Sequence, residues 1–584
     1  MNILGIHDGH TATACLLQEG SLVAMVSEER FNRQKNCAGI PQQAIRWILE
    51  STHTTPSQID AVALSGLVQP WIDPNITIWN DTRRPILPNL IVAVTQFLPP
   101  QLWGSNPIVT PYVKLMSKMR KLDTLVKLLD ELGIPIRRLT IVEHHLAHIS
   151  SSYYLSPFTK ERTIAEPILA ITLDASGDGI GGTVSIAQGN NIKRLLFIPT
   201  YHSIGMMYKI VTRYLGMKPM DHEYKVMGLA PYAPEELAKR AYQIFSRYLG
   251  LSTDGLRFLN TSGKFDKGFE KQLERDLRGI RFDAVAAGIQ LLLEEVVTAF
   301  IRNWIKHTGV KKIVLGGGIF MNVKLNMLIQ SLPEIESVFF MPSAGDESNA
   351  AGAALSTAIK LGEPQIKPLN GLYLGPEFTT TQIEGTLHQY EKQVVWERIP
   401  TQFTETKTVE LLLQGHIVGR FAGRMEWGAR ALGNRSILAD GRDLSVIRKI
   451  NAAIKQRDFW MPFAPSLLWE RQQDYLVNPR NVDAPYMALG FHSTPLAQVH
   501  LKAALHQYDL TCRPQLVRSE INPRYHNLLK EWERLTGCGG LLNTSFNLHG
   551  EPIVCSPKDA IETFLRSEID DLMIEDYWIQ RKNN

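Results

Sequence analysis

The chain has 584 residues, of which 44% are hydrophobic and 21% are charged, and its formal net charge is +4. This composition is ordinary for a globular protein and argues against a disordered, collagen-like or coiled-coil chain. Because 62 Lys and Arg residues are balanced by 58 acidic ones, no strong field draws the chain to nucleic acid or to a membrane surface.

The N-terminus lacks a basic region followed by a long apolar stretch, so it predicts no signal peptide. No apolar run reaches the ~20 residues typical of a membrane-spanning helix. The five cysteines are scattered, odd in number and form no C-x-x-C motif; they are Cys15, Cys37, Cys512, Cys538 and Cys555. We therefore expect a cytoplasmic protein with free thiols.

Two stretches, 2–29 and 168–199, share one pattern: an apolar run, an Asp/Gly-rich turn, a second run, a polar turn and a third run. Each predicts a meander of three strands, with Asp8 and Asp174 in the first turns. A pair of such stretches predicts an α/β domain built from two duplicated halves. The actin-like, sugar-kinase and heat-shock ATPase architectures have this form, and two unrelated meanders remain the alternative.

Helical periodicity predicts a helix within 108–133 and one long helix over 283–309, ended by Gly309. Residues 68–107 are rich in Trp, Pro and Asn, which is typical of a surface insertion and is also compatible with a cap over a substrate pocket. The Pro- and Gly-rich stretch 362–378 is the best domain boundary. It predicts one domain over 1–370 and a second over 371–584.

The sharpest local motif is Glu143-His144-His145-Leu146-Ala147-His148. On a helix, His144 and His148 are four residues apart and share one face, so both imidazoles can bind one ion, whereas His145 points elsewhere. Two histidines with a carboxylate from another segment are typical of an Fe(II) or Zn site. The alternative is a surface or capping histidine cluster; a metalloprotease motif would need a glutamate that is missing.

Gly-rich turns follow apolar runs at Asp8-Gly9, at 174–179 and at 316–318. Glycine lets the backbone approach a phosphate closely, so the three turns together predict a nucleotide site. Residues 177–182 match G-x-G-x-x-G, but a strand pattern rather than a helix follows, which excludes a dinucleotide fold. Asp346, in an acidic turn before a run of small residues, offers a hard oxygen ligand to a phosphate-bound metal.

The C-terminal third is crowded with Arg, Asn, Thr and Ser in short motifs. Arginines among glycines in 415–442 favour anion recognition over a solvated face. Lys455 and Arg457 are two apart, which suits an extended segment with both cations on one side. The stretch 541–552 offers hydroxyl and amide donors to a phosphate or carbonyl oxygen. Nucleic-acid binding by a basic face is disfavoured because aromatic residues do not alternate with the cations.

At these motifs the sequence resembles the O-carbamoyltransferase family of nodulation-factor, cephamycin and tobramycin biosynthesis. The resemblance covers nearly the whole chain. It rests on His7-Asp8, SEERFNRQKN (27–36), EHHLAH (143–148), HEYKVMGLAPY (222–232), LGGGIFMNVKLN (315–326), GDESNAAGAAL (345–355), EWGARALGNRSILADGR (426–442), IKQRDFWMPFAPS (454–466) and LLNTSFNLHGEPIV (541–554).

The resemblance implies an N-terminal actin-like domain, similar to the tRNA threonylcarbamoyl transferases, and a C-terminal YrdC-like domain. The second domain would make carbamoyladenylate from carbamoyl phosphate and ATP. The first would transfer the carbamoyl group to a hydroxyl of a small-molecule natural product and release AMP. The implied cofactor is a divalent metal, Fe²⁺ at the protein site with Mg²⁺ accompanying ATP. No nucleic-acid or membrane partner is implied, and a homodimer is left open.

The resemblance also assigns residues. The catalytic residues would be His7, Asp8, Lys455 and Arg457. The metal ligands would be His144, His148, Asp174 and Asp346. The nucleotide or carbamoyl phosphate would contact Gly316, Gly317, Gly318, Asn322, Glu223, Lys225, Arg420, Arg430, Arg513, Ser545 and Asn547.

Three departures from the family pattern bear on the acceptor geometry. Asp174-Ala175-Ser176-Gly177-Asp178 replaces the usual Asp-Gly-x-Gly-Glu, and Leu510 replaces a Gly. His10 takes the place of a Ser and competes with His7 as the base. No motif identifies the acceptor; the candidates are a sugar hydroxyl, an aminoglycoside or a guanidinium-type alkaloid alcohol. Rival functions are an actin-like sugar kinase and a tRNA-modification scaffold or nucleotide sensor, and the near-neutral charge argues against tRNA.

Overall fold

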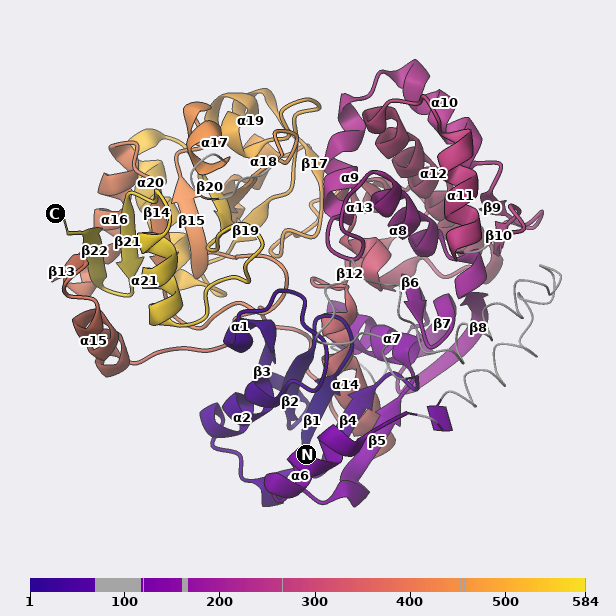
Figure 1. Cartoon of the computed structure of the whole chain (residues 1–584), viewed down its shortest axis with the longest axis horizontal. Helices are drawn as coiled ribbons and strands as arrows, with labels where there is room; N and C mark the ends of the chain where they lie inside the picture. The colour runs from indigo at the N-terminus through magenta and orange to yellow at the C-terminus, as the bar shows by residue number, and fades with distance from the viewer. Residues whose placement is uncertain are drawn as a thin grey trace. The chain divides into compact units, whose positions relative to one another are not determined.

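The computed structural model describes residues 1–68, 117–118, 120–159, 166–264, 266–451, 454 and 458–582. Chain contacts divide these residues into two compact units (Figure 1). Unit 1 contains residues 1–28 and 36–369, and unit 2 contains residues 29–35 and 370–584. Nearly all of the predicted insertion, and the first part of the helix predicted within 108–133, lie outside the described residues; α6 (Asp123–Glu131) forms the described part of that helix.

Unit 1 contains two five-stranded sheets with the same topology. The strand orders are β3-β2-β1-β4-β5 and β8-β7-β6-β11-β12. In each sheet the first three strands along the chain pair antiparallel, and two later strands extend the sheet in parallel from the first one. This repeat confirms the two duplicated halves predicted from the sequence, as expected for an actin-like domain.

The strands of the first sheet are β1 (Asn2–His7), β2 (Thr13–Gln18), β3 (Ser21–Ser27), β4 (Ala61–Ser65) and β5 (Leu139–Val142). Those of the second are β6 (Ile168–Gly177), β7 (Ile180–Gln188), β8 (Asn191–Pro199), β11 (Lys312–Gly316) and β12 (Ser337–Phe340). A hairpin of β9 (Leu249–Leu251) and β10 (Phe258–Asn260) stands apart. Further helices are α2 (Gln42–Ser51), α8 (Ile204–Tyr214), α9 (Glu223–Leu229), α10 (Glu235–Phe245), α11 (Asp266–Asp276) and α13 (Val323–Ser331).

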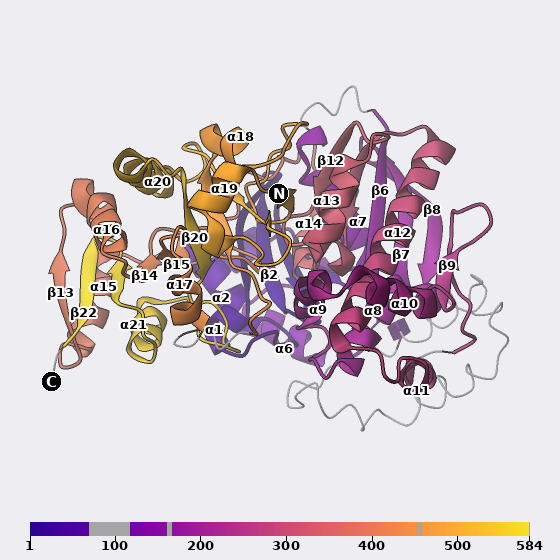
Figure 2. The ribbon, with the colours of Figure 1, turned by 90° about the horizontal axis from the view of Figure 1, so that it is seen from above.

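Helices α7 (His144–Tyr154) and α14 (Asn349–Lys360) join the two halves of unit 1. α7 packs on β6 and β11, α14 packs on β1, β2 and β4, and the two helices pack on each other (Figure 2). Glycine makes this approach possible, because a Cβ on Gly352 would lie 1.8 Å from the carbonyl oxygen of Ala147. The start of each helix is therefore held close to the strand ends of both sheets.

The long apolar helix predicted over 283–309 is α12 (Phe282–Thr308). It ends where the Gly309 N–H donates to the Ile305 carbonyl at 2.8 Å, with Gly309 at φ 72°. Among the described residues it is the one helix long and apolar enough to cross a membrane, and it is mostly buried within unit 1. The five cysteines are all free thiols.

Unit 2 is built on an eight-stranded mixed sheet in the order β13-β22-β21-β14-β15-β20-β16-β19. Its strands are β13 (Val394–Arg398), β14 (Val418–Phe421), β15 (Arg435–Ala439), β16 (Ala464–Leu468), β19 (Gln515–Val517), β20 (Gly540–Ser545), β21 (Asp571–Ile574) and β22 (Tyr577–Arg581). A small ladder joins β17 (Phe491–His492) and β18 (Thr511–Cys512). Its helices are α1 (Glu29–Asn32), α15 (Thr380–Gln389), α16 (Thr404–Leu413), α17 (Ser445–Ile450), α18 (Gln472–Tyr475), α19 (Pro495–His500), α20 (Pro523–Thr536) and α21 (Pro557–Leu565).

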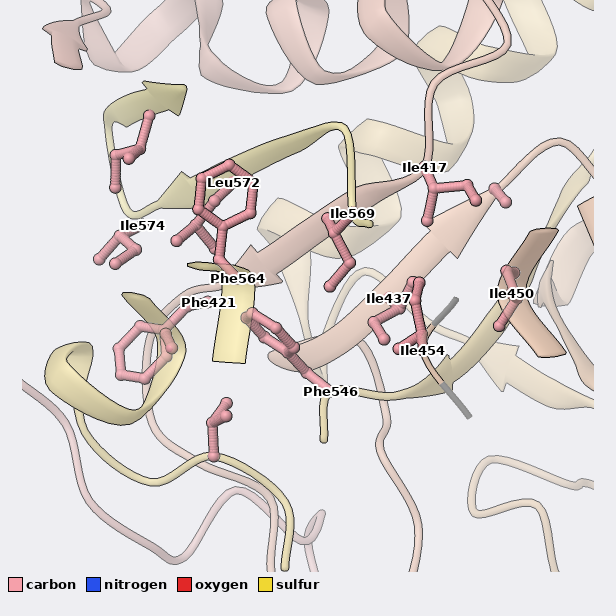
Figure 3. Packing of buried hydrophobic residues seen from close by; sticks show 14 of the residues in the cluster. Ile417, Phe421, Ile437, Ile450, Ile454, Phe546, Phe564, Ile569, Leu572 and Ile574 are labelled. Carbon is pink, nitrogen blue, oxygen red and sulfur yellow. The ribbon is translucent and has the colours of Figure 1, made fainter. Parts of the chain in front are cut away.

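The two faces of the central strands of unit 2 differ. One face carries an apolar core in which Phe421, Ile437 and Leu572 pack with Phe564 of α21 (Figure 3). On the other face the ladder pairs Arg420 with Ser436, and Ser436 with Ser545. Directly paired residues point to the same side of a sheet, so these three polar side chains form one row. The chain as a whole is α/β, as predicted.

Candidate metal centre and anion-binding loops

The predicted histidine pair lies at the start of α7, directly after β5. Glu143 caps the helix: its carboxylate accepts hydrogen bonds from the N–H groups of His145 (3.0 Å) and Leu146 (2.9 Å). Since the helix begins at His144, residues 144 and 148 lie one turn apart on one face, and both side chains are buried. This agrees with the shared face predicted from the spacing.

Two aspartates complete the cluster. Asp174 lies on β6, and Asp346 lies in the turn that precedes α14. From His148 Nε2 the distances are 3.3 Å to Asp174 Oδ2 and 3.4 Å to Asp346 Oδ1; from His144 Nε2 they are 3.6 and 3.4 Å. One candidate ligand atom from each of the four residues lies within 4.8 Å of the others. The structure thus brings together all four residues that the resemblance assigns to a metal.

The electrostatics of the cluster favour a bound cation. Burial disfavours charge on both imidazoles, but the neighbouring carboxylates outweigh it and raise the pKa of His144 and of His148. Conversely, the histidines hold the pKa of Asp346 well below its ordinary value despite burial. The two Nε2 atoms lie only 3.1 Å apart, so two protonated rings would repel each other. Two imidazole nitrogens and two carboxylates fit a divalent transition-metal ion.

Glycines keep the space around this cluster open. A Cβ on Gly177 would lie 2.0 Å from Cδ2 of His144, and one on Gly318 would lie 3.1 Å from Oδ1 of Asp174. Gly317, at φ 94°, donates its N–H to the Ala344 carbonyl at 2.9 Å. The predicted phosphate turn 316–318 therefore borders the cluster. The 177–182 stretch is a strand–turn–strand between β6 and β7, which confirms that it does not open a dinucleotide fold.

His7, at the end of β1, faces the cluster. Its Nε2 lies 3.9 Å from Asp346 Oδ2, and its Nδ1 lies 2.7 Å from Oγ of Ser65 at the end of the adjacent strand β4. Burial is the largest influence on the pKa of His7 and lowers it to about 4, so the ring is neutral near pH 7. A proton on Nδ1, donated to Ser65, leaves Nε2 as a free acceptor directed at the cluster.

The two neighbours of His7 named in the sequence analysis behave differently. Asp8 does not share the cluster; its Oδ1 accepts a hydrogen bond at 2.7 Å from Nη2 of buried Arg120. His10 is half-buried in the following turn, and its competition with His7 as the base stays a prediction.

His145 points away from the candidate metal ligands, as predicted. Its Nδ1 lies 2.9 Å from Thr172 Oγ1 and its Nε2 lies 3.0 Å from the Ile180 carbonyl oxygen. Burial lowers the pKa of His145 to about 3, so the ring is neutral. It packs the helix onto the second sheet.

Four residues close to the cluster were not expected from the sequence. Ser65 and Arg120 contact His7 and Asp8; Asn349 Nδ2 lies 3.3 Å from His148 Nε2; and the Asp178 carboxylate accepts the His144 N–H at 2.8 Å. Asn349 follows Asp346 within the GDESN motif, and Asp178 lies in the acidic turn after Asp174, so both had a local signal. Ser65 and Arg120 lie in segments that carry none.

The remaining site residues predicted in unit 1 are engaged mainly with nearby protein groups. Asn322 caps α13 through a 3.0 Å bond from the Leu325 N–H, and its amide pairs with that of Gln290. Glu223 Oε1 accepts the Met220 N–H at 2.7 Å, and burial raises the pKa of Glu223 to about 7. Lys225 follows on α9 and is half-buried.

In unit 2, Arg420 and the Ser545–Asn547 pair are ordered by local hydrogen bonds. Arg420 is buried and donates from Nη1 to the Gly433 carbonyl at 2.6 Å. Ser545 donates to Oδ1 of Asn547 at 2.6 Å, and Asn547 Nδ2 donates to the Glu551 carbonyl at 2.7 Å. Two further predicted arginines, Arg430 and Arg513, are half-buried, whereas Lys455 and Arg457 lie outside the described residues.

Comparison with known proteins decides the family. The model of the carbamoyltransferase N-terminus matches residues 2–355, and that of the carbamoyltransferase C-terminus matches residues 409–581. The chain belongs to the carbamoyltransferase family. This confirms the resemblance stated from the motifs, and it makes the protein an enzyme.

Named relatives agree with this assignment. Nodulation protein NolNO of Sinorhizobium fredii is 31% identical over 99% of this chain and 79% of its own. The 3'-hydroxymethylcephem-O-carbamoyltransferase of Amycolatopsis lactamdurans is 31% identical over 46% of this chain and 48% of its own. Among solved structures, component A of the Acidaminococcus fermentans (R)-2-hydroxyglutaryl-CoA dehydratase covers 62% of this chain and 98% of its own, at 14% identity and a TM-score of 0.32.

Proposed function

We propose that this carbamoyltransferase is an ATP-dependent O-carbamoyltransferase with two successive reactions. In the first, carbamoyl phosphate and water give carbamate and phosphate, and carbamate attacks ATP to give carbamoyladenylate and pyrophosphate. In the second, a hydroxyl of a small molecule takes the carbamoyl group and AMP leaves. The observation that carries the proposal is the convergence of His7 on the His144–His148–Asp174–Asp346 cluster in a chain that matches both family models.

We assign the first reaction to unit 2. Carbamate is a weak nucleophile that decomposes in water, so its site must hold an anion and exclude solvent. Arg420 suits this task because its buried guanidinium donates to the Gly433 carbonyl and to the amide oxygen of Asn434, and no carboxylate of the described residues forms an ion pair with it. Ser545 lies two strands away in the same row of the sheet, and it and its partner Asn547 would bind the anion by exchanging the hydrogen bonds that they make in the structure. Lys455, Arg457, Arg430 and Arg513 would supply the other cations.

We assign the second reaction to unit 1. Ser65 holds His7 with Nε2 free to accept the proton of the attacking hydroxyl, which is general-base catalysis by a neutral ring. The backbone of Gly316–Gly318, beside the cluster, would contact the phosphate of the adenylate. His144, His148, Asp174 and Asp346 would hold a divalent ion, Fe²⁺ in our proposal. When bound, such an ion neutralises phosphate charge and polarises the transferring carbonyl.

The acceptor class follows from the relatives rather than from the geometry. One relative is named for the transfer of a carbamoyl group to a hydroxymethyl group of a cephem. We therefore propose an alcohol of a small natural product as the acceptor, with a sugar hydroxyl, an aminoglycoside and a guanidinium-type alkaloid alcohol as the compounds to test first.

Product analysis tests the proposal. Purified protein with Fe²⁺, Mg²⁺, ATP and carbamoyl phosphate should catalyse carbamoyl-phosphate-dependent exchange of pyrophosphate into ATP without any acceptor. With a suitable alcohol it should release AMP. ADP formation that ignores carbamoyl phosphate would overturn the proposal in favour of a kinase of the actin-like class.

Substitution of Lys455 tests which unit performs the first reaction. Lys455→Ala should abolish pyrophosphate exchange, since the anion loses a cation, while transfer from carbamoyladenylate supplied directly persists. Lys449→Ala, an exposed lysine on α17, is the matched control. Exchange at the wild-type rate in Lys455→Ala would remove this residue from the first site.

A further inference from the structure

Seven residues of the N-terminal third, Glu29–Lys35, belong to unit 2. We call this segment the strap; it contains the short helix α1. The residue before it is fixed in unit 1, where the Glu28 carboxylate accepts the Gln43 and Ala44 N–H groups at 3.1 and 2.8 Å. The strap forms the middle of the SEERFNRQKN motif, to which neither the resemblance nor the proposed function gives a role.

The strap contacts two loops that carry proposed anion-binding residues. The first loop, 422–434, connects β14 to β15 and contains Arg430. The second loop, 546–556, connects β20 to α21, follows Ser545 directly and contains Asn547.

Arg33 fixes the second loop. Its Nη1 donates to the Ile553 carbonyl at 2.7 Å and its Nη2 to the Pro552 carbonyl at 2.8 Å, while Nε lies 3.6 Å from Oδ1 of Asp559 at the start of α21. Because Asn547 binds the carbonyl of Glu551, three successive carbonyls of this loop are held by side chains. A planar guanidinium suits such a two-pronged contact, and an ammonium group does not.

Arg30 fixes the first loop on the N-terminal side of Arg430. Its buried side chain donates from Nη2 to the Gly428 carbonyl at 2.9 Å. On the other side of Arg430, residues from the 370–584 part of unit 2 hold the loop: the Gln515 amide and the Tyr373 hydroxyl both donate to the Leu432 carbonyl, each at 2.8 Å. Arg430 therefore lies between two fixed points, one of which the strap supplies.

Phe31 connects the two loops. It packs against a buried cluster of Met425 and Ala431 from the first loop and Ile553 and Cys555 from the second. One aromatic side chain thus packs on a cluster to which both loops contribute, between two arginines that bind the backbones of these loops.

We propose that Arg30, Phe31 and Arg33 are positioning residues for the carbamoyl phosphate site of unit 2. The inference rests on the proposed function. An anion site works when its donors are held in place before the ligand arrives, because no binding energy is then lost in ordering them. The N-terminal strap supplies this order to two loops that would otherwise be held only by the 370–584 part of unit 2.

Arg33→Ala in the full-length protein tests the inference. The KM for carbamoyl phosphate in the ATP–pyrophosphate exchange should rise about 10-fold, as for loss of a residue that orients a ligand-binding group. The KM for ATP, and transfer from carbamoyladenylate supplied directly, should stay within about twofold of wild type. Arg33→Lys keeps the positive charge but cannot donate to two carbonyls at once, so its KM for carbamoyl phosphate should lie between those of wild type and Arg33→Ala. Arg46→Ala, an exposed arginine paired with Glu131 in unit 1, is the control.

The outcomes are separable. A lower thermal midpoint and a lower exchange kcat with an unchanged KM for carbamoyl phosphate would show that Arg33 only stabilises the fold and would overturn the inference. If Arg33→Ala does not fold, the KM for carbamoyl phosphate of Arg33→Lys and of Arg30→Lys tests the inference instead. Wild-type protein without any exchange would overturn the proposed function, and the strap's role with it; exchange in wild type and an equal KM in all variants would overturn the inference alone.

Discussion

The candidate metal-ligand cluster of unit 1 and the strap-bound loops of unit 2 both gather polar side chains, but the partners of these side chains differ. In the cluster, imidazole nitrogens and carboxylate oxygens converge on each other within 4.8 Å. In the loops, guanidinium groups donate to backbone carbonyls. The first arrangement concentrates electron pairs and suits a cation; the second fixes the backbone around arginines and suits an anion.

Under the proposed function, one chain needs both regions. Carbamate would be bound as an anion while it is activated, and the adenylate formed from it would carry phosphate charge that a cation can neutralise. The predictions below test whether the two regions act in separate half-reactions.

Removal of both histidines of the cluster should have the largest effect. His144→Ala combined with His148→Ala leaves two carboxylates with no imidazole between them, so the purified protein should lose its divalent metal and transfer should fall at least about 100-fold. ATP–pyrophosphate exchange should remain. Metal content is measured by mass spectrometry, and each half-reaction separately.

His307→Ala, an exposed histidine of α12, is the matched control for that double variant. A normal metal content in the double variant would contradict the ligand assignment. A parallel loss of pyrophosphate exchange would contradict the assignment of the two regions to separate half-reactions, since the cluster would then serve both.

The sequence predicted those parts of the fold and site that depend on local patterns. The repeated strand meanders, α12 with its Gly309 end, and the shared face of His144 and His148 all follow from periodicity or spacing within one segment. Asp346 was predicted as a metal ligand from its acidic turn, the resemblance joined it and Asp174 to the histidine pair, and the structure brings the four residues together.

Other features could not be predicted because they depend on which distant segments meet. Ser65 meets His7 only because β4 pairs with β1 in parallel, and Arg120 meets Asp8 across 112 positions. The strap is the clearest case: Arg33 binds a carbonyl 520 positions later, and no spacing rule reaches that far. Its motif was noticed, but its role needed the contacts.

Loss of the proposed base, His7, should have the second-largest effect on carbamoyl transfer. His7→Asn removes the free Nε2 that faces the cluster, so transfer should slow by about 100- to 10,000-fold, the usual contribution of a general base. Exchange should be unchanged, because His7 lies in unit 1. Rates of AMP release with acceptor present check this.

His10→Asn separates the two candidate histidines of the turn after β1. If His10→Asn slows transfer and His7→Asn does not, the base is His10. That result would also show that the contact of His7 with Asp346 has no catalytic meaning.

Ser65→Ala should have a smaller effect of the same kind. Without its hydroxyl, the His7 ring loses the hydrogen bond that orients it, which is worth about 1 kcal/mol and so about a 5- to 10-fold lower transfer kcat. The KM for the acceptor should not change. Ser65→Thr keeps the hydroxyl and should restore the rate, and Ser57→Ala is a control at an exposed serine. A Thr variant as slow as the Ala variant would contradict the orienting role.

A final contrast, in stability and not in rate, lies between two kinds of buried carboxylate within unit 1. Histidines hold the pKa of Asp346 low, whereas burial raises the pKa of Glu223 to about 7 from an ordinary 4.5. A raised folded-state pKa means that the neutral Glu223 carboxyl stabilises the fold fully below about pH 4.5, and that this stability is lost as the pH rises through 7. Glu223→Gln cannot ionise, so it should gain about 2 kcal/mol relative to wild type between pH 5 and 8. Thermal midpoints across that range measure the gain, with exposed Glu236→Gln as control; a difference that does not vary with pH would mean that Glu223 is charged throughout and that burial does not set its ionisation.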